Sequence, residues 1–118
     1  MDKSIITIKQ AHSIENVISK SRFIAYIKPV STENEAKAFI DEIKTKHKDA
    51  THNCSAYTVG PEMNIQKAND DGEPSGTAGI PMLEILKKQE IHNVCVVVTR
   101  YFGGIKLGAG GLIRAYSG

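Results

Sequence analysis

The sequence predicts one domain in which strands and helices alternate, in the order β-β-α-β-α-β-α. Two observations lead to this expectation: apolar residues alternate with a period of two in several short runs, and they recur every three or four residues in others. The chain has 118 residues, of which 41% are hydrophobic, and this is enough for an ordinary core without disulfides or metal. We therefore expect residues 1–118 to form a single folding unit.

Two strands and a helix are expected first. The isoleucines within residues 5–10 form a β-prone run, and residues 23–27 alternate until Pro29, which cannot donate to a sheet ladder. Thr32 and Glu35 have the spacing of a capping box, which marks the start of a helix. The apolar face of this helix comprises Ala36, Phe39, Ile40, Ile43 and His47. The opposite face is charged, as is typical of a helix that buries one side.

A third strand, a long loop and a second helix follow. Residues 52–59 alternate again and predict a strand. Residues 60–79 lose the pattern and are rich in glycine and acids, and a loop of this length in a compact domain is commonly functional or mobile. Pro81 suits the first turn of a helix that ends near Lys88.

The last strand and the last helix flank a cluster of glycines. Residues 91–98 are nearly all apolar and β-branched, which suits a central strand covered on at least one face. Residues 99–102, at the carboxyl end of this strand, lead into the cluster. A final helix is expected from Gly110 or Gly111, and it reaches the end of the chain after two turns at most. From this we expect the sequence to be part of a longer protein.

The glycine cluster is the first candidate site. Five of the ten glycines fall within nine residues, a density that suits positive φ angles or close approach of another group. The first N–H groups of the following helix are unpaired and could hold an anion. Arg100, Lys106 and Arg114 flank the cluster and give residues 91–118 a charge of +3, because no acid lies among them. An anion or nucleic-acid backbone site and a tight structural connection both remain open.

Two known phosphate-binding motifs do not fit this cluster. Gly103 and Gly108 have the GxxxxG spacing, but Ala109 and Gly110 stand where a nucleoside-triphosphate loop needs Lys and Ser or Thr. A dinucleotide fingerprint fails because Ile113 occupies the position of its third glycine.

The second candidate loop holds Asp70, Asp71, Glu73 and Ser75. Such carboxylates could ligate Mg²⁺ or act in acid and base chemistry, but the spacing of an EF-hand is absent and neighbouring acids in a loop are commonly just solvated. Ser75 lacks the GxSxG elbow of a nucleophile, and loop capping explains it better. We therefore assign no catalytic residue, metal or cofactor.

The aromatic residues near the glycine cluster are expected in two places, at the surface and in the interior. Arg100 and Tyr101 are expected at the surface, where an arginine beside an aromatic ring suits stacking on the bases of single-stranded nucleic acid. Phe102 and Tyr116 are expected to pack under the glycine loop.

Cysteine usage and hydropathy indicate the compartment. Cys54 and Cys95 lie in apolar runs without a CxxC spacing, which predicts reduced cytoplasmic thiols rather than a disulfide. The N-terminus lacks the apolar core of a signal peptide, and no apolar run approaches membrane-spanning length. A cytoplasmic protein without a membrane partner is therefore expected.

Three stretches, taken together, resemble the YigZ/Impact family. They are HNCSAY at residues 52–57, DDGEPSGTAG at 70–79 and RYFGGIKLGAGGLIRAY at 100–116. SRFIA at residues 21–25 extends the likeness over nearly the whole chain. The resemblance implies an α+β two-layer sandwich similar to domain 2 of ribosomal protein S5, with a mixed β-sheet and helices on one face. Bacterial members continue into a small ferredoxin-like domain, so the chain is expected to be a fragment that lacks it.

The resemblance also implies a function. Eukaryotic members regulate translation by binding the activator of a starvation-responsive kinase, and for bacterial relatives it implies contact with nucleic acid or the translation machinery. We expect a non-enzymatic module that binds RNA or a ribosome-associated protein. The expected contact residues are Arg100, Tyr101, Gly103, Gly104, Lys106, Gly108, Gly110, Gly111 and Arg114. The alternatives are a phosphate- or nucleotide-binding enzyme that uses both loops, and two motifs that only interlock to stabilise the domain.

Overall fold

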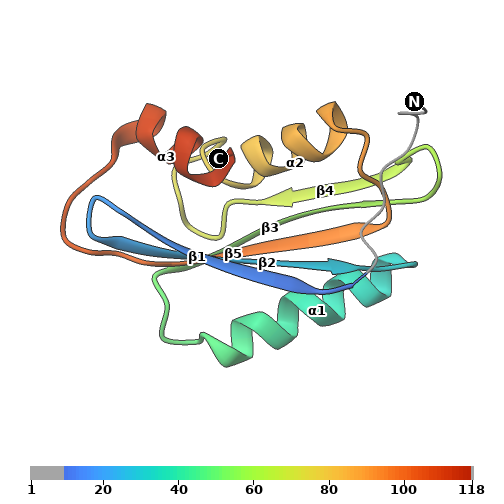
Figure 1. The fold of residues 1–118 in the computed structure, drawn as a ribbon, viewed down its shortest axis with the longest axis horizontal. Coiled ribbons are helices and arrows are strands. Elements are labelled where there is room, and N and C mark those ends of the chain that lie inside the picture. Colours follow the sequence, from blue (N-terminus) through green and yellow to red (C-terminus); the bar gives the residue numbers. More distant parts are fainter. Residues whose placement is uncertain (1–9, 118) are drawn as a thin grey trace.

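The computed structural model describes residues 10–117, and its core is one five-stranded sheet (Figure 1). The strands are β1 His12–Ile18, β2 Ser21–Pro29, β3 His52–Val59, β4 Ile65–Asn69 and β5 Val94–Tyr101. They lie side by side in the order β1-β2-β5-β3-β4, and every described pairing is antiparallel. The strand expected within residues 5–10 falls, except for Gln10, outside the described residues.

Three helices cover this sheet, and they lie on both of its faces. They are α1 Glu33–Lys46, α2 Gly79–Lys88 and α3 Gly108–Ser117. Figure 1 shows α1 below the sheet and α2 and α3 above it. The α+β class is confirmed, but the arrangement differs from the expected mixed sheet with helices on one face. None of these helices is long and apolar enough to span a bilayer.

The side chains of β5 explain why both faces are covered. Val94 and Val98 belong to the buried cluster that includes α2 and α3, whereas Cys95 and Val97 belong to the cluster that includes α1. A strand that is apolar on both sides needs a layer on each side. β2 and β3 run parallel to each other, as expected for strands joined through a helix, but β5 lies between them and is antiparallel to both. The sheet therefore contains no parallel pair among the described strands.

The start of α1 is confirmed as a capping box. The Glu35 N–H donates to Thr32 Oγ1 at 3.1 Å, and the Glu35 carboxylate accepts from the Ser31 N–H at 2.7 Å. The predicted apolar face is also confirmed, because Ala36, Phe39 and Ile43 are buried against the sheet.

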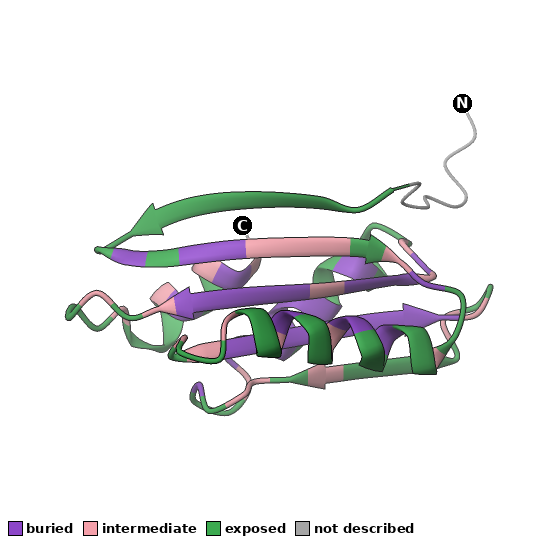
Figure 2. Cartoon of the chain, turned by 90° about the horizontal axis from the view of Figure 1, so that it is seen from below, coloured by how far each residue is buried: buried purple, intermediate pink, exposed green. Residues whose placement is uncertain are grey.

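Neither edge strand is predicted by periodicity. Every residue of β1 is exposed (Figure 2), so no alternation of apolar and polar side chains is required of it. β4 lies inside the segment predicted to be a loop, and only Ala68 of its residues is partly buried. A strand without a buried face leaves no hydrophobic pattern to read.

Candidate functional site

Arg100, the last buried residue of β5, is an interior cation rather than a surface one. Its side chain is 5% exposed, and its Nη1 donates to both carboxylate oxygens of Glu73, at 3.0 and 2.8 Å. Its Nε and Nη2 each donate to Ser21 Oγ at 3.3 Å. The expectation of a surface Arg100 is therefore wrong. Side chains alternate along a strand, and Arg100 occupies the side that faces α2 and α3.

Glu73 gathers side chains from three elements. Besides Arg100, its carboxylate accepts a short hydrogen bond from the Tyr116 hydroxyl of α3 and lies 3.4 Å from His52 Nε2 of β3. Burial, followed by the neighbouring Cys54 and Glu73, raises the pKa of the Tyr116 hydroxyl, which therefore remains a donor. Burying an unpaired carboxylate costs several kcal/mol of stability even after the protein relaxes around it. The ion pair with Arg100 offsets this cost for Glu73.

The two aspartates of the acidic loop hold the backbone in place. Asp70 accepts hydrogen bonds from the N–H groups of Gly76, Ala78 and Gly79, which include the start of α2. Asp71 Oδ2 accepts from the Asn53 N–H at 2.7 Å. The Asp70 bonds close the loop on itself, Asp71 joins it to β3, and the Glu73–Arg100 pair joins it to the end of β5.

The remaining acidic-loop candidate lies apart from this network. Ser75 is exposed on the outside of the loop. Within residues 10–117, no three His, Cys, Asp or Glu side chains are grouped in a way that could hold a metal ion.

The glycine turn between β5 and α3 depends on three of its glycines, for two different reasons. A Cβ on Gly103 would lie 1.9 Å from the carbonyl oxygen of Lys20, so only glycine fits against the β1–β2 turn. Gly104 and Gly108 have φ angles of +92° and +75°, which disfavour other residues. α3 begins at Gly108, two residues before the earlier of the predicted starts, so Gly110 and Gly111 lie within the helix.

A pocket of about 390 Å³ lies over the buried Arg100–Glu73 pair, and we call it the Phe102 pocket. It is lined by Thr51, His52, Glu73, Pro74, Arg100, Phe102, Lys106, Leu107, Gly108, Ala109 and Leu112. The expectation that Phe102 packs under the glycine loop is wrong, because 46% of its surface is exposed. Tyr116 is buried in the core beside Phe23, as expected.

A second hollow of about 280 Å³ adjoins the first, and we call it the Arg114 hollow. Its lining residues are Ile18, Ser19, Lys106, Leu107, Gly111, Arg114 and Ala115. Lys106 and Leu107 line both spaces, so the two hollows meet at these residues. The structure therefore brings Lys106 and Arg114 together with Gly108 and Gly111 on one surface, whereas Gly103, Gly104 and Gly110 line neither hollow.

Tyr101 does not belong to this surface. It follows Arg100 in β5 and so faces the opposite side of the sheet, where its hydroxyl lies 2.6 Å from His47 Nδ1 at the end of α1. The grouping of Tyr101 with Arg100 and Lys106 is thus wrong in space, although these residues are close in sequence.

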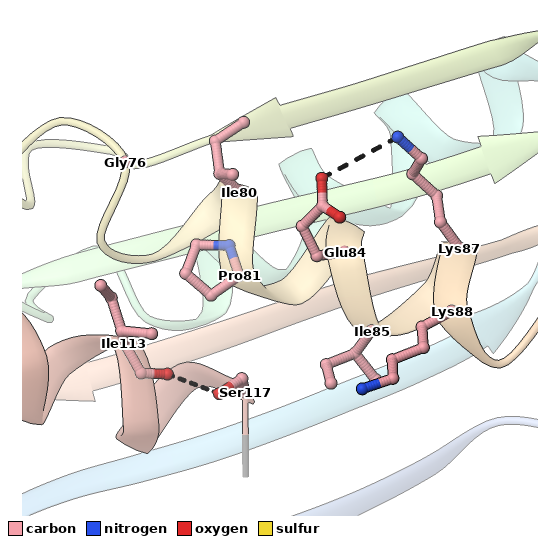
Figure 3. Close-up of a pocket in the computed structure, with 9 residues that line it drawn as sticks. All are labelled: Gly76, Ile80, Pro81, Glu84, Ile85, Lys87, Lys88, Ile113 and Ser117. Carbon is pink, nitrogen blue, oxygen red and sulfur yellow. Dashed lines mark hydrogen bonds and ion pairs between the residues drawn. The ribbon is translucent and has the colours of Figure 1, made fainter.

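A wider hollow of about 700 Å³ runs between the outer sides of α2 and α3 (Figure 3). Exposed Ile80, Ile85 and Ile113 line it, and Lys87 beside it forms an ion pair with Glu84 at 3.8 Å. None of the predicted contact residues of the two candidate loops lines this hollow, and Ile113, which does line it, is not one of them.

Sequence reasoning passes over His52 and Ser21, which complete the buried network. His52 Nδ1 lies 2.9 Å from the Asp71 carbonyl oxygen, and His52 Nε2 faces Glu73. The contact of His52 with Glu73 follows from the strand register, because His52 lies opposite Arg100 in the pair of β3 and β5. That register is set by the fold and is not visible in either stretch alone.

Comparison with known proteins identifies the family. The Impact N-terminal domain model matches residues 19–118. The chain belongs to the Impact family. It is 66% identical over 113 residues to the Bacillus subtilis IMPACT family member YvyE, covering 96% of this chain and 52% of that protein. It is 45% identical to Escherichia coli YigZ, covering 86% and 50%. The chain thus spans about half the length of these relatives.

Two solved structures are similar to this Impact-family chain. The crystal structure of a hypothetical protein matches with a TM-score of 0.88 and 40% identity, over 92% of this chain and 53% of that one. The two-domain translational regulator Yih1 matches with a TM-score of 0.56 and 28% identity, over 88% and 43%.

Proposed function

We propose that this Impact-family domain is a translation-linked regulatory module that binds RNA through the glycine-rich basic surface formed by the Phe102 pocket and the Arg114 hollow. The link to translation is supported by the similarity to Yih1, which is a translational regulator. In the proposed complex, Lys106 and Arg114 contact phosphates, and N–H groups at the start of α3 face phosphate oxygens. Arg100 holds the acidic loop instead of contacting RNA.

The observation that carries the proposal is a pair of exposed cations that no acid balances among the residues lining the two hollows. Lys106 and Arg114 are both exposed and line the same hollow. Among the residues that line the Phe102 pocket and the Arg114 hollow, Glu73 is the one acid, and Arg100 neutralises it. Uncompensated positive charge at a concave surface attracts a polyanion.

Salt dependence tests this proposal. Affinity for a short single-stranded RNA should fall as salt rises from about 50 to about 200 mM, with a log–log slope of about 0.7 per phosphate contacted. The double variant Lys106→Ala/Arg114→Ala removes two contacts, so it should bind more weakly and reduce that slope by about 1.4. Fluorescence anisotropy of a labelled oligonucleotide measures both quantities.

The matched control is Lys37→Ala/Lys48→Ala, which removes the same charge from exposed positions in and just after α1. This control should keep the wild-type slope, because α1 lies on the other face of the sheet (Figure 1). If both double variants lose affinity equally, the effect is net charge and the proposed surface is wrong. Failure of the wild-type chain to bind RNA at low salt rejects the function itself.

A further inference from the structure

The Phe102 ring is an exposed aromatic surface with a rigid backing. Phe102 is 46% exposed, and the Arg100 guanidinium lies 5.4 Å from the centre of its ring. Arg100 cannot move away, because Glu73 and Ser21 hold it. The Phe102 N–H also donates to Thr51 Oγ1 at 2.9 Å, which fixes the backbone. A planar ring held in this way is preorganised to stack on another planar group.

The pocket beside this ring has the size and composition of a ligand site. Its volume of about 390 Å³ falls within the range of roughly 300–1,000 Å³ that is usual for small-molecule sites. Pro74, Leu107 and Leu112 supply apolar walls, and His52, with 17% of its side chain exposed, is a polar group in the lining. An apolar slot with a few polar groups suits a flat heterocycle better than an ion.

The neighbouring Arg114 hollow adds a second exposed cation to Lys106, which already lines the Phe102 pocket. Lys106 stands at the junction of the two spaces, and Arg114 lines the second one together with Ser19. The Phe102 ring, Lys106 and Arg114 therefore lie in this order across the face. A single nucleic-acid strand presents the same kinds of groups, since a phosphate joins each nucleoside, with its base, to the next.

We propose that these two hollows hold consecutive nucleotides of single-stranded RNA, with one unstacked base in the Phe102 pocket and the adjoining phosphates at Lys106 and Arg114. This inference rests on the proposed RNA-binding function and adds two details: the RNA is single-stranded, and Phe102 stacks on one of its bases. A base-paired duplex keeps its base faces stacked inside the helix, so it cannot insert a base without paying for unpairing. The site therefore selects single strands.

Phe102→Ala tests the stacking contact. Loss of one base–aromatic stack corresponds to a decrease in affinity of between about 5-fold and about 150-fold for single-stranded RNA. Phe102→Trp should retain the affinity, because indole also stacks. Ile113→Ala is the matched control, since it removes an exposed apolar side chain from the α2–α3 surface and should leave binding unchanged. An amide NMR spectrum of each variant verifies that the fold is intact.

Three probes separate this inference from the function on which it rests. Single-stranded RNA should bind the wild-type chain more tightly than a blunt-ended RNA duplex with the same number of phosphates, because the duplex has no unpaired base. An abasic oligonucleotide should bind wild type and Phe102→Ala equally. If Lys106→Ala/Arg114→Ala weakens binding but Phe102→Ala does not, or if the duplex binds as tightly, the base pocket is rejected and RNA binding stands. If the wild-type chain binds none of the probes, both proposals fail.

Discussion

At the scale of single residues, Glu73 is the group on which the site depends. It is the buried acid that neutralises Arg100, and it also accepts from Tyr116 and faces His52. Arg100 in turn backs the Phe102 ring through a cation–π contact. Removal of the carboxylate thus affects both stability and the surface proposed to bind RNA.

Glu73→Gln should destabilise the domain strongly. The substitution leaves the Arg100 guanidinium buried without a counter-charge, which typically costs about 3–5 kcal/mol in free energy of unfolding. Glu84→Gln is the control, because it breaks only the exposed pair with Lys87, an interaction worth roughly 0–1 kcal/mol. Urea unfolding of both variants measures the difference. Equal, small losses would show that the Glu73–Arg100 pair does not stabilise the fold.

At the scale of elements, the N-terminus of α2 is capped by a side chain from the preceding loop. Its N-cap position is Ala78, which makes no side-chain cap. Asp70 replaces that cap: one of its oxygens accepts from the Ala78 and Gly79 N–H groups, at 3.1 and 2.8 Å. The negative charge also lies at the positive end of the helix dipole. The loop and the helix are therefore one structural unit.

Asp70→Ala should consequently loosen the start of α2. The loss expected for a helix cap is about 0.5–2 kcal/mol, and the Gly79 amide should exchange with solvent faster than in wild type. Asp70→Asn keeps an oxygen acceptor and should lose less. Hydrogen exchange followed by NMR reports on the Gly79 amide directly. Unchanged exchange in Asp70→Ala would contradict the capping role.

The elements also show which structural features local sequence patterns predict and which they do not. The capping box at Thr32 and the apolar face of α1 are local features, so periodicity and spacing predict them correctly. β1 has no buried side, and β4 is short, so neither produces a pattern. The burial of Arg100 depends on Glu73, which is 27 residues away in the chain. Such a pairing is decided by the fold, and charge alone wrongly indicates the surface.

At the scale of the whole molecule, two layers of helices stabilise different parts of one sheet. Figure 1 shows α1 on one face of the sheet and α2 and α3 on the other. Residues of α3 line the Phe102 pocket, and a second polar network lies at the end of α1. In that network His47 joins three elements: its Nε2 lies 2.6 Å from the Tyr26 hydroxyl of β2, and its Nδ1 lies 2.6 Å from the Tyr101 hydroxyl of β5. The Tyr101 hydroxyl also donates to Asp49 at 3.2 Å.

This network predicts how the stability of the domain depends on pH. Because Tyr101 donates its proton to Asp49, it accepts from His47 Nδ1–H, and the unprotonated Nε2 accepts from Tyr26. Burial, followed by the charge of Lys46, lowers the pKa of His47 below its ordinary value of 6.5. The unfolded chain then takes up a proton that the folded chain resists. The contribution of His47 to stability is therefore complete above pH 6.5 and decreases as the pH falls from 6.5 towards the lowered pKa.

Urea unfolding of wild type and His47→Gln at about pH 7.5 and about pH 5.5 measures this contribution. Wild type should lose more stability than the variant between the two values, since the variant lacks the titrating ring and all other groups are shared. The stability difference between the two proteins should shrink at the lower pH. Parallel losses would mean that His47 titrates alike in the folded and unfolded chains, and that the network joining α1 to β2 and β5 does not exclude the proton.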